Sequence, residues 1–111
     1  MGMELQVSAQ VDAVAQAFVS ARREARALSD YPGVVPAALD TAYFIQDRAI
    51  HFDGRAVAGW KVGRINPPLD GTLGANRLSG PIFADSIVDA ASGAEPEMPV
   101  FEGGFAAGEA E

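Results

Sequence analysis

The chain has 111 residues, of which 49% are hydrophobic and 21% charged, and its formal net charge is -7. This length allows one small domain, and the composition is that of a folded protein rather than a disordered one. Residues 1–77 hold eight acidic and eight basic residues, whereas residues 78–111 hold seven acidic residues and no basic one. Because nucleic acids and anionic membranes bind basic surfaces, this charge disfavours both as partners.

Cysteine is absent, and histidine occurs once, as His51. Disulfides, thiolate metal sites and cysteine nucleophiles are thereby excluded, and a bound metal would need oxygen ligands, which favour Mg²⁺, Mn²⁺ or Ca²⁺. No apolar stretch approaches the roughly 20 residues of a membrane helix, and the first residues lack the features of a signal peptide. We therefore expect a cytoplasmic protein with no membrane partner.

Two helices are predicted in the first half of the chain. Apolar residues recur at helical spacing through 8–28, and a cluster of turn-forming residues ends this helix near Ser29. A second helix is predicted to begin at Pro36, where the missing N–H of proline costs nothing, and to end at about His51. The helical part of the domain is therefore expected to span 8–51.

The remainder, residues 55–111, is predicted to be rich in β-structure. A valine-containing segment over 55–63 has the pattern of a strand. The prolines and glycines of 66–81 predict a stretch that is mainly loop. Further short strands are expected within 82–89 and 100–111. Because helices come first and strands later, the sequence predicts a single α+β domain over residues 1–111.

Lys61 is the only lysine in the chain. If 55–63 is a strand, Gly59 and Gly63 flank Lys61 on its own face. Glycine inside a strand often marks the close approach of a ligand, so the ammonium would have space beside it to bind an anion or to carry a proton. The alternative is an exposed lysine on an ordinary edge strand.

Three acidic residues are the other candidates for a functional site. Asp85 lies among apolar residues, where a carboxylate needs a partner or a polar pocket, unless it is simply a turn aspartate. Glu109 and Glu111 are two positions apart, so on a strand both would point to one side and could bind one cation. The simpler interpretation of this common pattern is a solvated acidic tail. Nucleotide-binding, zinc-protease and serine-hydrolase motifs are absent.

The order of five segments resembles a known family. TAYFIQD, RAVAGWKVGRINP, LG, GPIFAD and GEAE follow one another much as in the N-terminal part of the 2-keto-4-pentenoate hydratase family, within the fumarylacetoacetate hydrolase superfamily. The resemblance covers about residues 8–111. It implies homo-oligomers and an incomplete fumarylacetoacetate-hydrolase-like fold, in which N-terminal helices lead into short strands of a mixed, rolled β-sheet. Because members of the family are much longer, we expect this chain to be the N-terminal portion of a larger hydratase-like domain.

The resemblance also implies an activity and the residues that carry it. Members of the family are metal-dependent lyases that add water to 2-hydroxy-2,4-dienoates, giving 4-hydroxy-2-oxoacids in the catabolism of aromatic compounds. Glu109 and Glu111 match the E-x-E pair that holds Mg²⁺ or Mn²⁺ with a third acidic residue, which has no counterpart in this chain. Lys61 and Asp85 match residues expected to be catalytic, through proton transfer and the positioning of water.

Two other functions stay open at this point. One is a 4-oxalocrotonate-type decarboxylase or an acylpyruvate hydrolase of the same superfamily, whose substrates pass through the same kind of enolate. The other is a non-catalytic interaction module, or a proteolytic fragment. A truncated sheet would leave an unpaired edge, which favours association with another chain.

Overall fold

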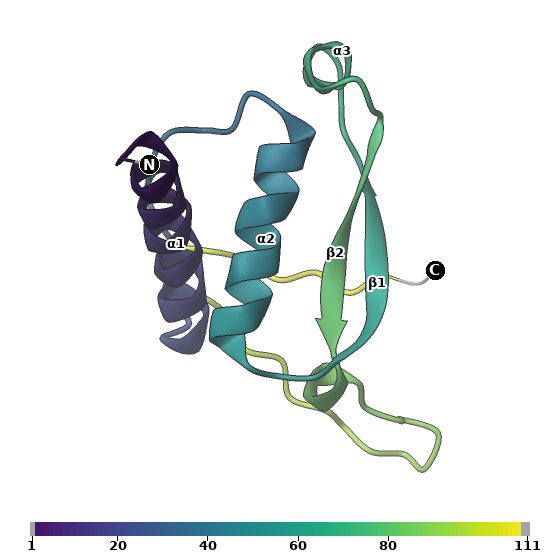
Figure 1. The fold of residues 1–111 in the computed structure, drawn as a ribbon. Helices are drawn as coiled ribbons and strands as arrows, with labels where there is room; N and C mark the ends of the chain where they lie inside the picture. The colour runs from purple at the N-terminus through teal and green to yellow at the C-terminus, as the bar shows by residue number, and fades with distance from the viewer. Residues whose placement is uncertain (1, 110–111) are drawn as a thin grey trace.

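A computed structural model describes residues 2–109, with side chains from Val7 onward, as three α-helices, two β-strands and one 3₁₀ turn. In chain order these elements are α1 (Gly2–Arg23), α2 (Leu39–Asp53), β1 (Val57–Arg64), α3 (Leu69–Leu73), β2 (Arg77–Phe83) and η1 (Ala84–Ser86). Figure 1 shows α1, α2, β2 and β1 side by side in that order, with α3 at the turn between the strands. The predicted α+β class is confirmed.

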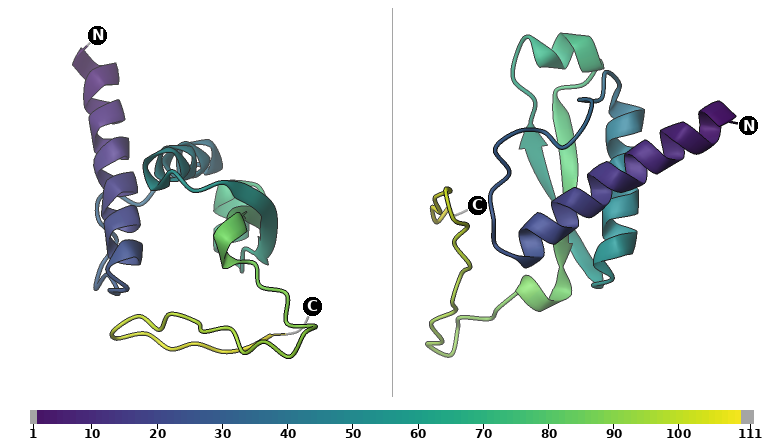
Figure 2. Two further views of the ribbon diagram at one scale, coloured as in Figure 1. Left: turned by 90° about the horizontal axis from the view of Figure 1, so that it is seen from below. Right: turned by 90° about the vertical axis from the view of Figure 1, so that its left-hand side faces the viewer.

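The hydrophobic core lies between α1 and α2, two helices that cross each other in Figure 2. Its buried residues are Val11, Val14 and Ala15 of α1 and Ile45 of α2. They recur along α1 at the spacing of an amphipathic helix, so that one stripe of α1 faces α2. At the rim of this contact, Arg48 Nε donates to Asp12 Oδ1 at 2.7 Å. All of the buried hydrophobic residues described, except Ile65, belong to this helix pair.

α1 ends at a backbone turn rather than at the end of its apolar pattern. The helix predicted over 8–28 begins earlier, at Gly2, and also ends earlier, at Arg23. Ala25 takes a left-handed conformation with φ 50°. The amides of Ala25 and Arg26 donate to carbonyls of the last helical turn at 3.1 and 2.9 Å. This C-cap closes the helix, although apolar residues continue at helical spacing beyond it.

α2 lies close to its predicted position. It begins at Leu39 rather than at Pro36, and it ends at Asp53, near the predicted boundary. Gly54 then takes φ 80°, and its amide donates to the Ile50 carbonyl at 3.2 Å. Glycine adopts this left-handed conformation readily, so the chain turns toward the sheet directly after α2.

β1 and β2 form an antiparallel hairpin. Val57 lies opposite Phe83 and Arg64 lies opposite Arg77, with an irregularity in the register just after Val57. The strand predicted over 55–63 is therefore present with slightly shifted ends. The prediction of a loop over 66–81 is wrong, because that stretch holds α3 and most of β2.

β2 contains Pro81, although a proline in a sequence is usually evidence against a strand. The amide and the carbonyl of Ser79 point away from β1, toward α2. Because the bonding direction alternates along an antiparallel strand, the nitrogen of Pro81, two positions on, lies on the same outer edge. Because this edge does not face β1, the absence of an N–H at Pro81 removes no hydrogen bond between the two strands.

The remaining predicted strands are formed within residues 2–109 only at Ile82 and Phe83, the last two residues of β2. The segment 82–89 holds the end of β2 and then η1. Between 100 and 109 the strand-like contact is one isolated parallel bridge, Arg26 to Glu102, after which Gly103 turns the chain with φ 81°. The described sheet is thus two-stranded and antiparallel rather than mixed. The fumarylacetoacetate-hydrolase-like fold stays a prediction.

α2 covers the outer edge of β2 through two side chains. Gln46 Nε2 donates to the Ser79 carbonyl at 2.8 Å, and the Ser79 amide donates to the Tyr43 hydroxyl at 2.9 Å. The helix thus supplies the donor and the acceptor that a neighbouring strand would supply. Gly80 fits this arrangement, since a Cβ at that position would lie 3.8 Å from Gln46 Nε2.

Removal of the Tyr43 hydroxyl should weaken this attachment. We expect Tyr43→Phe to lower the free energy of unfolding by about 1 kcal/mol, because the Ser79 amide loses its acceptor. Tyr31→Phe is the matched control, since the Tyr31 hydroxyl makes no hydrogen bond within the described part of the chain. Urea denaturation followed by circular dichroism measures both changes. Equal losses from the two substitutions would contradict the role given to Tyr43.

Candidate functional site

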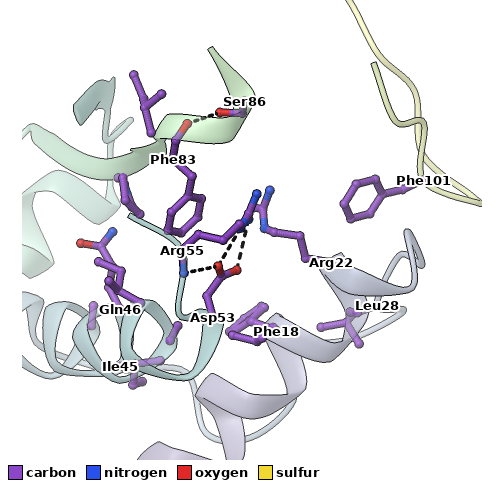
Figure 3. A pocket seen from close by; sticks show the side chains of 18 of the residues that line it. Phe18, Arg22, Leu28, Ile45, Gln46, Asp53, Arg55, Phe83, Ser86 and Phe101 are labelled. Atoms are coloured by element: carbon purple, nitrogen blue, oxygen red, sulfur yellow. Dashed lines mark hydrogen bonds and ion pairs between the residues drawn. The ribbon is translucent and has the colours of Figure 1, made fainter. Parts of the chain in front are cut away.

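Charged side chains gather between the end of α2 and the end of β2. Arg55 binds Asp53 through Nε–Oδ1 at 2.7 Å and Nη2–Oδ2 at 3.1 Å. It also binds Asp85 through Nη1–Oδ1 at 3.1 Å. The Arg55 guanidinium stacks over the Phe83 ring, 4.1 Å from its centroid. Asp53, Arg55 and Asp85 are called the ion cluster below, and Figure 3 shows the Asp53–Arg55 part of it beside a cavity.

The ion cluster is anchored at its buried member, Asp53. The Asp53 side chain is 6% exposed, compared with 36% for Arg55 and 62% for Asp85. Hydrogen bonds from Arg55 hold the pKa of Asp53 below its ordinary value of 3.8, and Asp53 in turn raises the pKa of Arg55. Both groups are therefore charged at neutral pH. The contact with Asp85 is more open to solvent and contributes less stability.

Arg23 joins α1 to the same corner of the molecule. Its Nη2 donates to the carbonyl of Phe52 at 3.0 Å and to the carbonyl of Asp53 at 3.1 Å. Carbonyls in the last turn of a helix lack partners within the helix, and a cation there also complements the helix dipole. The ends of both helices and the ion cluster are thereby fixed relative to one another.

A cavity of about 820 Å³ lies beside the ion cluster, between α1, α2 and β2. Its walls are mainly apolar and include the rings of Phe18, Tyr31, Phe83 and Phe101. Arg22 and Arg55 also line it, and Figure 3 shows the Arg22 side chain extending from α1 toward the Arg55 guanidinium. An apolar cavity of this size with a few charged groups is typical of a small-molecule site.

Lys61 and Asp85, the catalytic residues predicted from the sequence, lie at different levels of the hairpin. Lys61 is exposed on β1 opposite Gly80, and Asp85 is exposed in η1. A strand rises about 3.3 Å per residue, so about 10 Å of backbone separates Gly80 from Phe83, where β2 ends. The residues that line the cavity include neither of the two. Their catalytic roles stay predictions.

The surroundings of Lys61 agree with one part of the prediction made for it. A Cβ at Gly63 would meet no atom within 4 Å, and a Cβ at Gly59 would approach only Ile82 Cδ1, at 3.9 Å. There is thus open space beside Lys61 on its own face. The exposure of Lys61 also agrees with the simpler interpretation, an edge-strand lysine, just as Asp85 lies in a turn.

The carboxylates that the structure describes do not by themselves fit the expected metal site. Glu109 is exposed on a segment without secondary structure, and Glu111 lies outside the described residues. Within residues 2–109, no three His, Asp or Glu side chains gather where they could hold a metal ion. The Mg²⁺ or Mn²⁺ site at Glu109 and Glu111 therefore stays an expectation from the resemblance.

The ion cluster is the part of the site that sequence reasoning missed. In the sequence, Asp53 and Gly54 indicate only a turn after a helix. The local signal was the arginine two positions after the aspartate, which can fold back across that turn. The bond from Arg55 to Asp85 joins residues 30 positions apart and has no signal in a single sequence.

Comparison of the chain with models of protein families, with curated proteins and with solved structures finds no match. The helices in the described part of the chain include none that is both long enough and apolar enough to cross a membrane. The function is therefore inferred from the residues themselves.

Asp53→Asn should destabilise the protein in a pH-dependent manner. At neutral pH we expect a loss of about 2 kcal/mol, because Arg55 loses a charged, nearly buried acceptor. The pKa of Asp53 is lowered on folding, so its contribution is complete above 3.8 and is lost as the pH falls through the lower native value. Urea denaturation at a series of pH values from neutral to acidic should therefore show the two proteins converging at low pH.

Asp47→Asn provides the control for this experiment. It makes the same change of charge on the exposed side of the same helix. We expect its effect to stay within about 0.5 kcal/mol at every pH, as for other exposed substitutions. A loss from Asp53→Asn that does not change with pH would contradict the ion-pair explanation.

Proposed function

We propose that the chain carries the N-terminal portion of a hydratase that adds water to 2-hydroxy-2,4-dienoates. The observation that supports this is that three of the five segments carrying the family resemblance contact one another. Tyr43 and Gln46 of TAYFIQD hydrogen-bond to β2. The strand in RAVAGWKVGRINP pairs with β2, which contains the first four residues of GPIFAD. The bond from Arg55 to Asp85 is a second contact between RAVAGWKVGRINP and GPIFAD. Segments inherited as one unit are expected to pack in this way.

Lys61 is assigned to the substrate carboxylate. Its ammonium is a compact point charge on a flexible stem, and the glycines on either side of it, Gly59 and Gly63, leave space on the same face of β1. A carboxylate bound there would leave the rest of the dienoate free to lie along the hairpin. Because the lysine stem is long, one extended ligand can reach from Lys61 toward the end of β2.

Asp85 is assigned to proton transfer near the other end of the substrate. Tautomerisation of the dienol moves a proton from the 2-hydroxyl to C5, and water then adds with its hydroxyl at C4 and its proton at C3. A carboxylate that can accept and return a proton serves these steps, and the Lys61 ammonium is the second proton carrier. The open contact between Asp85 and Arg55 leaves a carboxylate oxygen available for this work.

Lys61→Ala should lower turnover of a 2-hydroxy-2,4-dienoate by about 10² to 10⁴-fold, the usual contribution of a positioned acid–base group. The rate is followed by the loss of ultraviolet absorbance as the conjugated dienoate is consumed. Arg64→Ala is the control, since it removes a positive charge from the opposite face of the same strand.

Three results of this assay would contradict the assignment. Undiminished turnover by Lys61→Ala would remove Lys61 from the reaction. If the protein turns over acylpyruvates but not dienoates, the result would support a hydrolase of the same superfamily instead. Turnover of oxalocrotonate-like diacids but not dienoates would support a decarboxylase.

The proposal includes a cytoplasmic homo-oligomer and a divalent cation at Glu109 and Glu111, as the resemblance implies. We expect millimolar Mg²⁺ or Mn²⁺ to raise the melting temperature, because a ligand at ten times its Kd stabilises the folded state by about 1.4 kcal/mol. Combined Glu109→Gln and Glu111→Gln should abolish the shift. Combined Glu95→Gln and Glu97→Gln, an equal change of charge in the same acidic third, should preserve it.

A non-catalytic interaction module is the second candidate. Within residues 2–109 the outer edge of β1 pairs with no other strand, and Trp60 and Val62 on that strand are each 54% exposed. An open, partly apolar strand edge favours association with a second copy of the chain. The metal titration separates the candidates, since the absence of any shift with either cation would favour the interaction module.

A further inference from the structure

We infer that the cavity between α1, α2 and β2 binds a small amphipathic carboxylate, with its apolar body among the aromatic rings and its carboxylate on Arg22. This inference does not use Lys61 or the pair Glu109 and Glu111, so it stands independently of the proposed hydratase activity. It is carried by the shape and lining of the cavity and by the charges at its border.

The apolar lining defines the body of the ligand. The cavity measures about 820 Å³, within the range of small-molecule sites. Four aromatic residues from separate parts of the chain line it: Phe18, Tyr31, Phe83 and Phe101. Phe18 and Tyr31 meet edge to face with their centroids 5.5 Å apart, so these two rings support each other in this wall. An aromatic or alkyl group placed here would leave water and gain these contacts.

The arginines define the polar end of the ligand. Four arginine side chains lie around this corner, and three of them are engaged. Arg23 binds the end of α2, Arg26 binds Glu24 at 2.9 Å, and Arg55 belongs to the ion cluster. Arg22 makes no hydrogen bond or ion pair within the described part of the chain, although it lines the cavity. Its planar guanidinium can therefore give two parallel hydrogen bonds to a carboxylate.

The neighbouring charges select a monoanion. A cationic ligand would meet Arg22 and Arg55 together, and Figure 3 shows these two side chains directed toward one another. A neutral ligand would leave the Arg22 donors unused. A dianion such as a phosphate would place a second negative charge near Asp53, which also lines the cavity and already balances Arg55. One planar carboxylate matches the one available guanidinium.

The test uses three probes that share one body, 4-phenylbutanoate, 4-phenylbutan-1-ol and 4-phenylbutylamine. Isothermal titration calorimetry with the 111-residue chain measures each Kd. We expect the acid to bind at least about tenfold more tightly than the alcohol or the amine, the factor set by a charge-assisted hydrogen bond. Equal affinity for acid and alcohol, or no binding of the acid, would overturn the inference.

Variants locate the binding. Arg22→Gln should weaken binding of the acid at least about tenfold and leave the alcohol unchanged. Arg77→Gln, the same change of charge at the far end of the hairpin, should have no effect. Ala42→Leu, which fills the cavity from α2, should weaken all three probes, with an unchanged circular dichroism spectrum showing that the variant is folded. Unaltered binding of the acid by Arg22→Gln would show that the carboxylate lies elsewhere and would overturn the assignment.

Discussion

The attachment of α2 to the outer edge of β2 is the constraint on which the rest of the structure depends. The hydrophobic core of the helix pair includes no residue of the hairpin. The hydrogen-bond ladder of the hairpin likewise includes no residue of the helices. Gln46 and Tyr43 join the two units by bonding to the backbone of Ser79. A strand edge needs hydrogen-bond donors and acceptors at fixed positions. Two side chains one helical turn apart can provide both. The distance between helix and strand then leaves room for the cavity.

The ion cluster is a second connection between α2 and β2, at the point where each of them ends. Asp53 is held by two hydrogen bonds from Arg55, and Arg55 in turn rests on Phe83, so the exit of α2 and the end of β2 share one group of side chains. Breaking such a group costs more than an exposed ion pair, since Asp53 would remain buried without its partner. The proposed roles of Lys61 and of Arg22 both depend on this frame. One uses the open face of the hairpin, and the other uses the space between the hairpin and the helices.

The sequence predicted those elements whose signals are local. Helical periodicity and the Asp53-Gly54 turn located α2, and the short, valine-containing pattern of 55–63 located β1. The end of α1 was misplaced because Ala25, a residue that rarely adopts a left-handed conformation, forms the C-cap. β2 was missed because Gly80 and Pro81 are typical of loops, and their place in a strand is explained by α2 lying on that edge. The ion cluster was missed because the bond from Arg55 to Asp85 joins residues 30 positions apart in the sequence.

The segment that carries Phe101 differs from the other walls of the cavity in how it is held. Two backbone hydrogen bonds fasten it to the turn after α1 within the described residues, Glu102 N–H to the Ala25 carbonyl at 3.0 Å and Ala27 N–H to the Glu102 carbonyl at 3.3 Å. Local opening requires only the free energy of the contacts that are broken, which here is far smaller than that of the helix core. This wall of the cavity can therefore open without unfolding of the helix core.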